Sequence, residues 1–583
     1  MAQETSQVRS PPVWPAVLAA LAIAIVGAAS VSMARSMGYD ESMHAELPAA
    51  RMVIAVQLGE WKAASDALLG CQQYPFVVPI ALALVQALTG VSELACRMSG
   101  RVFWAVALFA IFLVAREVAK AVARDRAKSD AQADSRASWV PWIAMGLAAL
   151  SPAALDFSGT LFLEVPFIAV AMFAVYAWLR RRRIGSAGHG RQDVVAGAML
   201  ALALYTKFNY GLLLAAGCAL DLGIEGIHAL RVKALRAWLE SAALIALVPL
   251  IASLWWFVLP LPGNLALGAE HRSAFMGFLA GNQHMLTAPF QQRLFDWGAG
   301  IFASPRMLLL SALAALFALR FVRVRELRTL VVIGLVCTIP VAMHPYHMDR
   351  LLLPSAPYLW IFAAVGLAAL LPRGLGARAV WLGALLALCL IRRDIDSLRL
   401  MDWGSPSSST APEIAEYRRK ALAEKISLTP ARKLQTNGLE RSESDAALDL
   451  IAAEAGGELR IGWLAAIEKL PPGALQVGLL ARGGPKQRFL HDVTGSMIFG
   501  VEPVDPVWDK ARLQAATKEF DVIFTTDPPQ AFGSGNKWAF LGDYCKVLTS
   551  ELGFRQKDFG QIVLHPPLGK DKDVRLIALR ASP

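Results

Sequence analysis

A group of titratable residues follows the first apolar run of the chain. Asp40, Glu41 and His44 come soon after residues 13–34, a run long enough to cross a bilayer. Asp40 and His44 are four residues apart and would share one face of a helix. Carboxylates at the edge of a hydrocarbon layer cost desolvation free energy, so they are candidates for function. The alternative is that Asp40 only caps a helix that lies on the membrane surface.

Further polar side chains lie where later apolar runs begin or end, or in the loops between them. They are Asp156, Glu164, Lys207, His271, His284, Tyr346 and Arg350. Simpler explanations exist: Glu164 would pair with an arginine, Lys207 would reach from a helix end to the interface, and Arg350 would be an interfacial anchor. Lone loop histidines such as His271 and His284 are mostly solvated surface. Taken together, these simpler explanations are less convincing, because several separate connectors would have to place acidic and basic side chains on the same outer face of the protein by accident.

Acids and cations at the edge of a bilayer suit chemistry on a lipid phosphate. Lys207 and Arg350 can bind a phosphate group, the arginine as a planar fork and the lysine as a point charge. A carboxylate such as Asp40 can orient or deprotonate an acceptor hydroxyl. When a sugar leaves a phosphate carrier, the leaving group is already a stable anion. It needs positive charge, and the carboxylate pair of a glycosidase is not required.

Composition identifies an integral membrane protein. Apolar residues make up 56% of the 583 residues and charged residues only 18%. The net charge of +11 comes from basic residues clustered between apolar runs, which indicates topology, and no nucleic-acid partner is expected. The six cysteines have no metal-ligand spacing. Cys71 and Cys96 fall in one predicted extracytoplasmic stretch, residues 35–101, and either pair or stay free.

The basic connectors predict the orientation of the chain. Residues 116–136, 180–191, 231–236 and 320–328 are expected in the cytoplasm. If all four connectors are cytoplasmic, only one of the two apolar runs between residues 75 and 118 can cross the membrane. The run at 75–91 is interrupted by Pro79 and Gln86, so it is expected to be an interfacial helix. The run at 193–222 must be a hairpin whose turn, at 206–209, lies outside. The result is an α-helical bundle of about eleven transmembrane helices with a cytoplasmic N-terminus.

The chain changes character after residue 392. Residues 393–412 have a linker composition, and short apolar runs in residues 413–583 alternate with helical stretches. The expected strands are 459–464, 475–480, 521–525, 561–564 and 574–579, and the expected helices are 444–455 and 543–552. This pattern predicts a small extracytoplasmic α/β domain.

Five stretches of residues 1–392 together resemble one family. They are the Asp40-Glu41 pair, Gln73-Tyr74-Pro75 with the later Gly90-Val91-Ser92-Glu93-Leu94-Ala95-Cys96-Arg97, Leu161-Phe162-Leu163-Glu164-Val165-Pro166, Leu204-Tyr205-Thr206-Lys207, and Arg350-Leu351-Leu352-Leu353-Pro354-Ser355-Ala356-Pro357. They resemble the polytopic glycosyltransferases of the GT-C fold, in particular the bacterial protein O-mannosyltransferase-like and lipid A aminoarabinose transferase-like enzymes. The motifs are short, so the resemblance depends on their order and shared outer face.

The resemblance implies a role for each motif. Enzymes of this family use polyprenyl-phosphate sugars and invert the anomeric carbon. By resemblance, Asp40 and Glu41 would be catalytic, and Lys207 and Arg350 would hold the carrier phosphate. The other candidates for substrate binding are Glu164, Asp156, His44 and Tyr346.

The sequence departs from the family pattern in two places. Some relatives carry an acid before the interfacial helix, where it helps to bind a metal ion. Here the positions hold Gln72, Gln73 and Tyr74, so we assign no metal ligand and leave a divalent metal cofactor open. Leu351 replaces the tyrosine of the Arg-Tyr-Leu-Leu element.

The sequence therefore predicts a multi-pass glycosyltransferase of the cell inner membrane that moves a hexosyl or pentosyl group from a lipid phosphate to a protein, lipid or glycan. One alternative is a transporter or flippase of a lipid-linked or polar solute, which would have polar residues at the midplane and repeated halves. The charges lie instead at the outer rim, and no internal repeat is found. A non-catalytic scaffold of the same fold is the other alternative, and it would tolerate substitution of Asp40.

Overall fold

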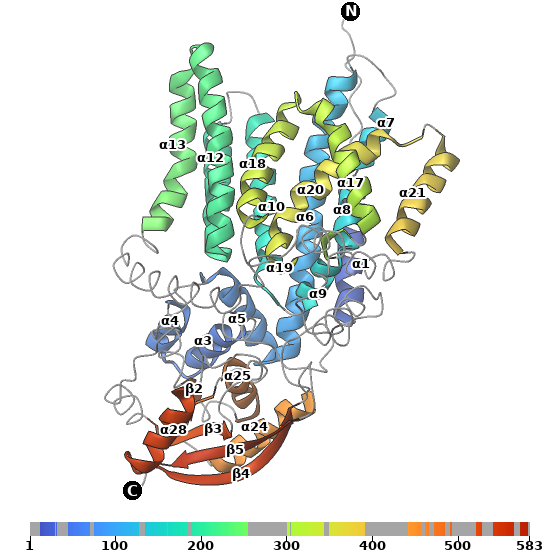
Figure 1. The fold of residues 1–583 in the computed structure, drawn as a ribbon. Helices are drawn as coiled ribbons and strands as arrows, with labels where there is room; N and C mark the ends of the chain where they lie inside the picture. The colour runs from blue at the N-terminus through green and yellow to red at the C-terminus, as the bar shows by residue number, and fades with distance from the viewer. Residues whose placement is uncertain are drawn as a thin grey trace, which may run out of the picture.

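The computed structural model has a bundle of long helices with a small α/β domain at one end (Figure 1). It describes residues 12–29, 31, 45–69, 75–127, 134–159, 161–183, 189–254, 300–302, 305–342, 349–372, 374–390, 441–455, 461–465, 472–483, 490–492, 520–527, 540–564 and 572–580. Several positions named above lie outside these residues: Asp40, Glu41, His44, Cys71, His271, His284, Tyr346 and the linker 393–412. For Asp156 only the backbone is described.

Helix α6 (Glu93–Ala127) runs through the bundle and packs against α1 (Trp14–Ala29), α8 (Val140–Ala149) and α10 (Glu164–Arg183). Its 35 residues span about 52 Å at the rise of an α-helix. Most of its apolar side chains are buried because neighbouring helices cover it on several sides. The remaining bundle helices are α7 (Asp134–Ala137), α9 (Pro152–Gly159), α11 (His189–Thr206), α12 (Phe208–Arg231), α13 (Leu235–Ser253), α17 (Pro305–Ala318), α18 (Arg325–Ala342), α19 (Asp349–Leu352), α20 (Ala356–Ala369) and α21 (Leu375–Leu390), with 3-10 turns at Leu319–Phe321 and Leu353–Ser355.

Four helical stretches among the described residues are long and apolar enough to cross a membrane: Glu93–Asp125, Phe208–Arg231, Leu235–Ser253 and Arg350–Ala369. Helices α8 and α9 would add a fifth if they count as one bent span. Other bundle helices are shorter or carry more charge, as with the four arginines that end α10. The structure therefore supports a membrane bundle, while the total of eleven spans stays a prediction.

The apolar run at residues 139–155 is broken into two helices. Helices α8 and α9 meet at an angle of 64°, with the break at Leu150 and Ser151. Pro152 lacks a backbone N–H and suits the first turn of a new helix. The Ser151 hydroxyl accepts a hydrogen bond from the Ala154 amide at 3.4 Å, as a helix cap does. Asp156 consequently lies within helix α9 and not in a loop between apolar runs.

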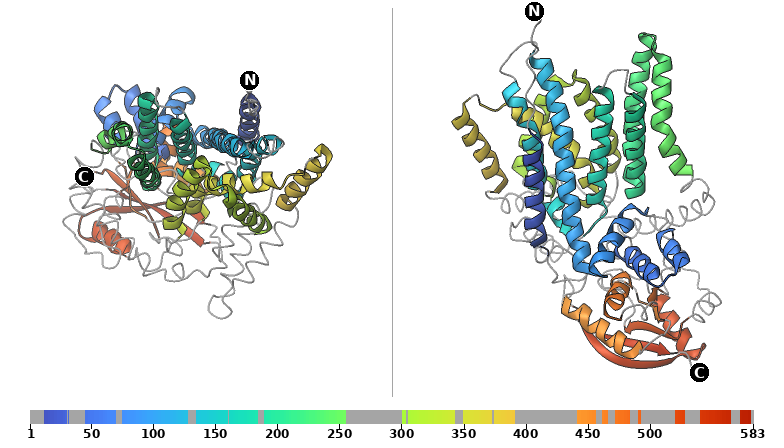
Figure 2. Two further views of the ribbon diagram at one scale, coloured as in Figure 1. Left: turned by 90° about the horizontal axis from the view of Figure 1, so that it is seen from above. Right: turned by 180° about the vertical axis from the view of Figure 1, so that it is seen from behind.

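Three short helices lie between the bundle and the α/β domain (Figure 1, and the view from behind in Figure 2). They are α3 (Leu47–Gln57), α4 (Trp61–Leu69) and α5 (Val77–Thr89). Helix α5 has 13 residues, about 20 Å, which is too short to cross a bilayer. Its Leu84 and Leu88 are exposed, as in a helix that lies along a membrane surface. This matches the interfacial helix predicted at residues 75–91.

The α/β domain contains one mixed sheet with strand order β2-β1-β3-β5-β4. Strands β2 (Leu490–Asp492), β1 (Ile461–Trp463) and β3 (Val522–Asp527) are parallel, and β5 (Lys572–Arg580) runs antiparallel to both β3 and β4 (Arg555–Leu564). Helices α24 (Arg441–Ala455), α25 (Pro472–Gly483) and α28 (Phe540–Ser550) complete the domain. Trp463, Phe524 and Leu576 are buried at its core.

One of the predicted strands is wrong, and one strand was missed. Residues 475–480 belong to helix α25 and not to a strand. Leu475 and Leu479 face the sheet, while Val477 and Leu480 contact α3, so both faces of this helix are apolar. A short run that is apolar on both sides has no periodicity to distinguish a helix from a buried strand. The three-residue strand β2 was not predicted.

Candidate functional site

Lys207 lies at a break between two helices. Helix α11 ends at Thr206 and α12 begins at Phe208, and Lys207 between them has an extended backbone with φ −155° and ψ 103°. The two helices pack closely as a hairpin at Gly211, where a Cβ atom would lie only 2.6 Å from the Cα of Leu204. The ring of Tyr205 contacts Phe76, with centroids 4.7 Å apart. The predicted turn at residues 206–209 is therefore present, and the interfacial segment packs against it.

Glu164 is the first residue of α10, where the positive end of the helix dipole favours a carboxylate. The preceding Leu161 has φ 62°, a left-handed conformation that is rare for a leucine. Helix α6 holds this segment from the other side. Arg101 Nη1 donates hydrogen bonds to the Leu155 carbonyl at 2.5 Å and to Ser158 Oγ at 2.6 Å. A Cβ on Gly100 would lie 2.2 Å from the Ser158 carbonyl oxygen, so this close approach requires glycine.

The structure brings Glu164, Lys207 and Arg350 together from three separate elements. Lys207 Nζ lies 2.6 Å from Glu164 Oε1, and Arg350 Nε lies 3.5 Å from the same oxygen. Glu164 is 1% exposed, whereas the side chains of Lys207 and Arg350 are 11% and 21% exposed. The buried acid therefore fixes the two cations at a partly open position. We call these three residues the charge cluster.

Two aromatic side chains support the cations of the charge cluster. The guanidinium of Arg350 lies over the Phe162 ring, 4.8 Å from its centroid, and Lys207 Nζ lies 5.3 Å from the centroid of Tyr210. The Tyr210 hydroxyl donates a hydrogen bond to the Leu351 carbonyl at 3.0 Å. Tyr210 thus joins the start of α12 to the segment that carries Arg350.

The charge cluster suits an anionic ligand with hydroxyl groups. Its two cations and one carboxylate carry a net charge of +1, and the cations are the more exposed members. A phosphate could pair with them by charge-assisted hydrogen bonds. Glu164 Oε2 is buried and has no hydrogen-bond partner among the described residues. Such an oxygen can accept a hydrogen bond from a ligand hydroxyl.

The part of the chain that directly follows Asp40, Glu41 and His44 lies close to the charge cluster. Ala45, the residue after His44, packs in one buried cluster with Leu161 and Leu163, which lead into Glu164. The side chains of Asp40, Glu41, His44, Asp156 and Tyr346 are outside the description, so their roles stay predictions. Cys96 is a free buried cysteine, and its thiol accepts a hydrogen bond from Gln86 at 3.0 Å. Within the described parts of the chain, no group of three or more His, Cys, Asp or Glu side chains could hold a metal ion.

Sequence reasoning missed the residues that position the charge cluster. They are Gly100, Arg101, Phe162 and Tyr210. The one available signal was Arg101, a cation close to the start of a long apolar run. The other three have residue types that are common in membrane helices, so only their contacts distinguish them.

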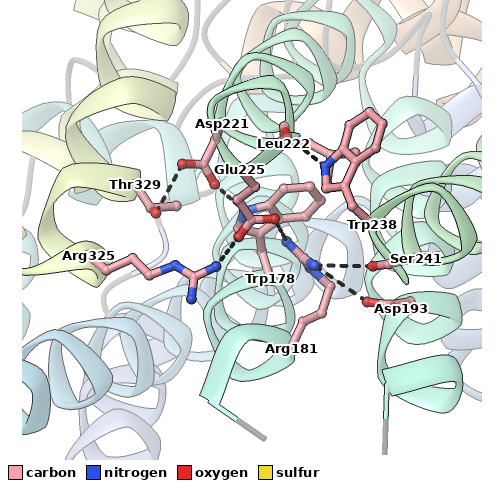
Figure 3. Close-up of polar contacts among 10 residues, drawn as sticks. All are labelled: Trp178, Arg181, Asp193, Asp221, Leu222, Glu225, Trp238, Ser241, Arg325 and Thr329. Atoms are coloured by element: carbon pink, nitrogen blue, oxygen red, sulfur yellow. Dashed lines mark hydrogen bonds and ion pairs between the residues drawn. The ribbon is translucent and has the colours of Figure 1, made fainter. Parts of the chain in front are cut away.

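A second polar cluster, drawn in Figure 3, includes residues near the C-terminal ends of α10 and α12, whereas the charge cluster lies at their N-terminal ends. Glu225 accepts hydrogen bonds from Arg181 at 2.9 Å and from Arg325 at 2.5 Å. Asp221 accepts them from Trp178 at 2.8 Å and from Thr329 at 3.1 Å. Arg181 also lies 3.6 Å from Asp193, donates to Ser241 and stacks on Trp178. We call this set the inner cluster.

The inner cluster ties five helices together and has a structural explanation. Its members come from α10, α11, α12, α13 and α18, and Asp193 and Asp221 are at most 1% exposed. Removing one partner of a buried ion pair leaves an uncompensated charge and costs about 3–5 kcal/mol. The sequence contained a signal for this cluster, because Asp221 stands inside an apolar run.

Comparisons with known proteins add information at the level of the fold. No protein-family profile and no curated protein sequence matches the chain. Crystal structures of ArnT from Cupriavidus metallidurans are similar, both in the apo state and bound to undecaprenyl phosphate. Each has a TM-score of 0.52, with 14% and 15% sequence identity, and the match covers 96% of this chain and 97% of ArnT.

A cryo-EM structure of the arabinofuranosyltransferase AftD from Mycobacteria is also similar. Its TM-score is 0.53 at 16% identity, and the match covers 99% of this chain and 40% of AftD. ArnT and AftD are glycosyltransferases of the GT-C fold. This chain, with its helical bundle, interfacial helices and terminal α/β domain, has the GT-C fold.

Proposed function

We propose that the chain is a membrane glycosyltransferase that transfers a sugar from a polyprenyl-phosphate donor to an acceptor at the extracytoplasmic face, with inversion. The observation that carries the proposal is the charge cluster: Lys207 and Arg350 held by the buried Glu164 at 2.6 and 3.5 Å. One of the similar ArnT structures is bound to undecaprenyl phosphate, which supports a polyprenyl phosphate as the lipid.

In the proposed reaction the bond between the anomeric carbon and the phosphate oxygen breaks, and different residues act on the phosphate and on the acceptor. Lys207 and Arg350 bind the phosphate and stabilise it as it leaves with the bonding electron pair. Asp40, with Glu41, accepts the acceptor proton while the acceptor oxygen attacks the opposite face of the anomeric carbon. Glu164 Oε2 and Asp156 bind sugar hydroxyl groups, and His44 and Tyr346 also bind the substrate. No step requires a general acid, because the departing phosphate is a stable anion.

The charge distribution supports an extracytoplasmic site. Helices α10 and α12 end in basic residues, Arg180 to Arg183 and Arg231, and α18 begins with Arg325. These ends lie away from the α/β domain (Figure 1). Basic helix ends stay in the cytoplasm, so the charge cluster and the α/β domain would face the outside of the inner membrane. The acceptor in this proposal is a protein, lipid or glycan exposed at that face.

Binding of radiolabelled polyprenyl phosphate to the full-length protein in nanodiscs tests the proposal. Arg350→Ala removes the planar donor from the phosphate site while Glu164 keeps Lys207 as its partner. We expect the affinity for polyprenyl phosphate to fall about tenfold or more, the loss of one charged hydrogen bond. Arg325→Met, which removes an arginine from the inner cluster, is the matched control and should retain wild-type affinity. A wild-type protein without affinity for polyprenyl phosphate contradicts the proposal.

Tyr210→Phe tests the connection between the two cations. It keeps the ring beside Lys207 and removes the hydrogen bond to the Leu351 carbonyl. We expect kcat/KM for sugar transfer to fall about fivefold, as the net contribution of one hydrogen bond predicts. Tyr210→Leu also removes the cation–π contact and should cost about tenfold or more. Equal rates for the two variants would show that the hydroxyl, and not the ring, is responsible for the effect.

A further inference from the structure

Helix α3 lies between the α/β domain and the segment that leads to Glu164. On one face, Ala49 and Val53 are buried in a cluster with Leu161 and Leu163. On another face, the buried side chains are spaced as i, i+3 and i+7 and pack against helix α25 of the α/β domain. These residues are Leu47, Ala50 and Ile54.

Helix α25 is likewise shared between two partners. Leu475 and Leu479, four residues apart, lie in the core of the α/β domain beside Trp463. Val477 and Leu480, three residues apart, are 3% and 4% exposed and pack against α3. A continuous chain of buried contacts therefore runs from the sheet through α25 and α3 to the segment before Glu164.

A polar contact fixes the register between the two helices. Arg51 of α3 donates a hydrogen bond from Nη2 to Oε1 of Gln476 at 2.7 Å. The two residues are 425 positions apart, and Gln476 is 2% exposed. Hydrogen bonds that involve a charged group are stronger and more directional than neutral ones. Apolar contacts alone would let the helices slide, whereas this contact specifies one arrangement.

We propose that the α/β domain is a positioning element for the transferase site, and that Gln476 and Arg51 are positioning residues. Through α25 the domain holds α3, and α3 holds Ala45, which directly follows His44, beside the segment that carries Glu164. The inference rests on the proposed glycosyl transfer, in which Asp40 must meet an anomeric carbon whose phosphate lies on Lys207 and Arg350. Small displacements of reacting groups cost large factors in rate, so a domain that makes no contact with the reacting atoms can still set kcat.

Charge substitutions at the α25–α3 contact test this role in the full-length protein. Gln476→Lys places a second cation beside Arg51 and should push the helices apart. We expect kcat to fall about tenfold or more, while the affinity for polyprenyl phosphate stays within about twofold because the charge cluster belongs to the bundle. The double variant Arg51→Glu with Gln476→Lys restores an attractive pair and should recover kcat to within about threefold. Arg482→Ala, on the same helix, breaks a 2.6 Å contact to Asp445 inside the domain and is the control with unchanged kcat.

Hydrogen exchange gives a readout that does not depend on enzymatic activity. In Gln476→Lys the backbone amides of α3 should exchange about tenfold faster or more, and those of α10 should not change. Wild-type kcat and wild-type exchange in Gln476→Lys would overturn the inference, and so would a double variant that fails to recover. If the wild-type protein transfers no sugar from a polyprenyl phosphate, the proposed function fails. The exchange of α3 then still decides whether the α/β domain holds this helix.

Discussion

Lys207→Met should reduce sugar transfer by about two to three orders of magnitude, the usual cost of removing one electrostatic stabiliser from a transition state. Lys207 Nζ lies 2.6 Å from Glu164 and is the better buried of the two cations. Its loss removes positive charge where the leaving phosphate accumulates negative charge. The measurement is single-turnover transfer from a polyprenyl-phosphate sugar, which separates chemistry from product release.

The structural cost of this substitution has to be separated from its chemical cost. Lys207→Met leaves Glu164, at 1% exposure, with Arg350 as its remaining partner in the cluster, so some loss of stability is expected. Glu164→Gln combined with Lys207→Met removes both charges and should recover the thermal stability but not the transfer. Lys207→Arg keeps the charge with different geometry and should retain about a tenth of the rate. A double variant that transfers sugar at the wild-type rate would show that the pair is only structural.

Asp40→Asn should abolish transfer, with a loss of about two to four orders of magnitude in kcat, the range of general base catalysis. The amide is nearly isosteric with the carboxylate but cannot accept the acceptor proton. The affinity for polyprenyl phosphate should not fall, because the phosphate is bound by Lys207 and Arg350. The informative measurement is therefore kcat together with donor binding on the same preparation.

The neighbouring acid supplies the control for Asp40. Glu41→Gln removes an equal charge one residue further along the chain and should have a smaller effect than Asp40→Asn. A non-catalytic scaffold would tolerate Asp40→Asn, because it needs no base. Wild-type transfer by Asp40→Asn would refute the assignment of the catalytic carboxylate.

The convergence of Glu164, Lys207 and Arg350 could be predicted from the sequence. The basic connectors orient the helices, and orientation places all three residues at one end of the bundle. The hairpin around Lys207 could be predicted for the same reason, because the basic connectors on both sides of it in the sequence had to lie on the cytoplasmic side of the membrane. The distribution of basic residues therefore predicted which distant parts of the chain lie on the same side of the membrane, and secondary-structure propensity does not contain this information.

The contacts that refine the site were not predictable from one sequence. Leu161 adopts a left-handed conformation beside the close approach at Gly100, and no local glycine or asparagine predicts it. The role of α25 was missed because residues 475–480 are apolar on both faces, and because the partner of Gln476 is 425 positions away. Packing between distant segments overrides local pattern at these positions.

The inner cluster has a consequence for how the protein is made. Arg181, Asp193 and Glu225 belong to helices synthesised in succession, whereas Arg325 follows later, on α18. A helix inserted alone would present such a charge to lipid at a cost of several kcal/mol. Arg181 can pair with Glu225 as soon as α12 is inserted, but Asp193 competes for the same guanidinium, so the early helices would remain loosely associated at the translocation channel until α18 emerges and Arg325 becomes a second partner of Glu225. Biogenesis of this half of the bundle would be completed cooperatively, late in translation.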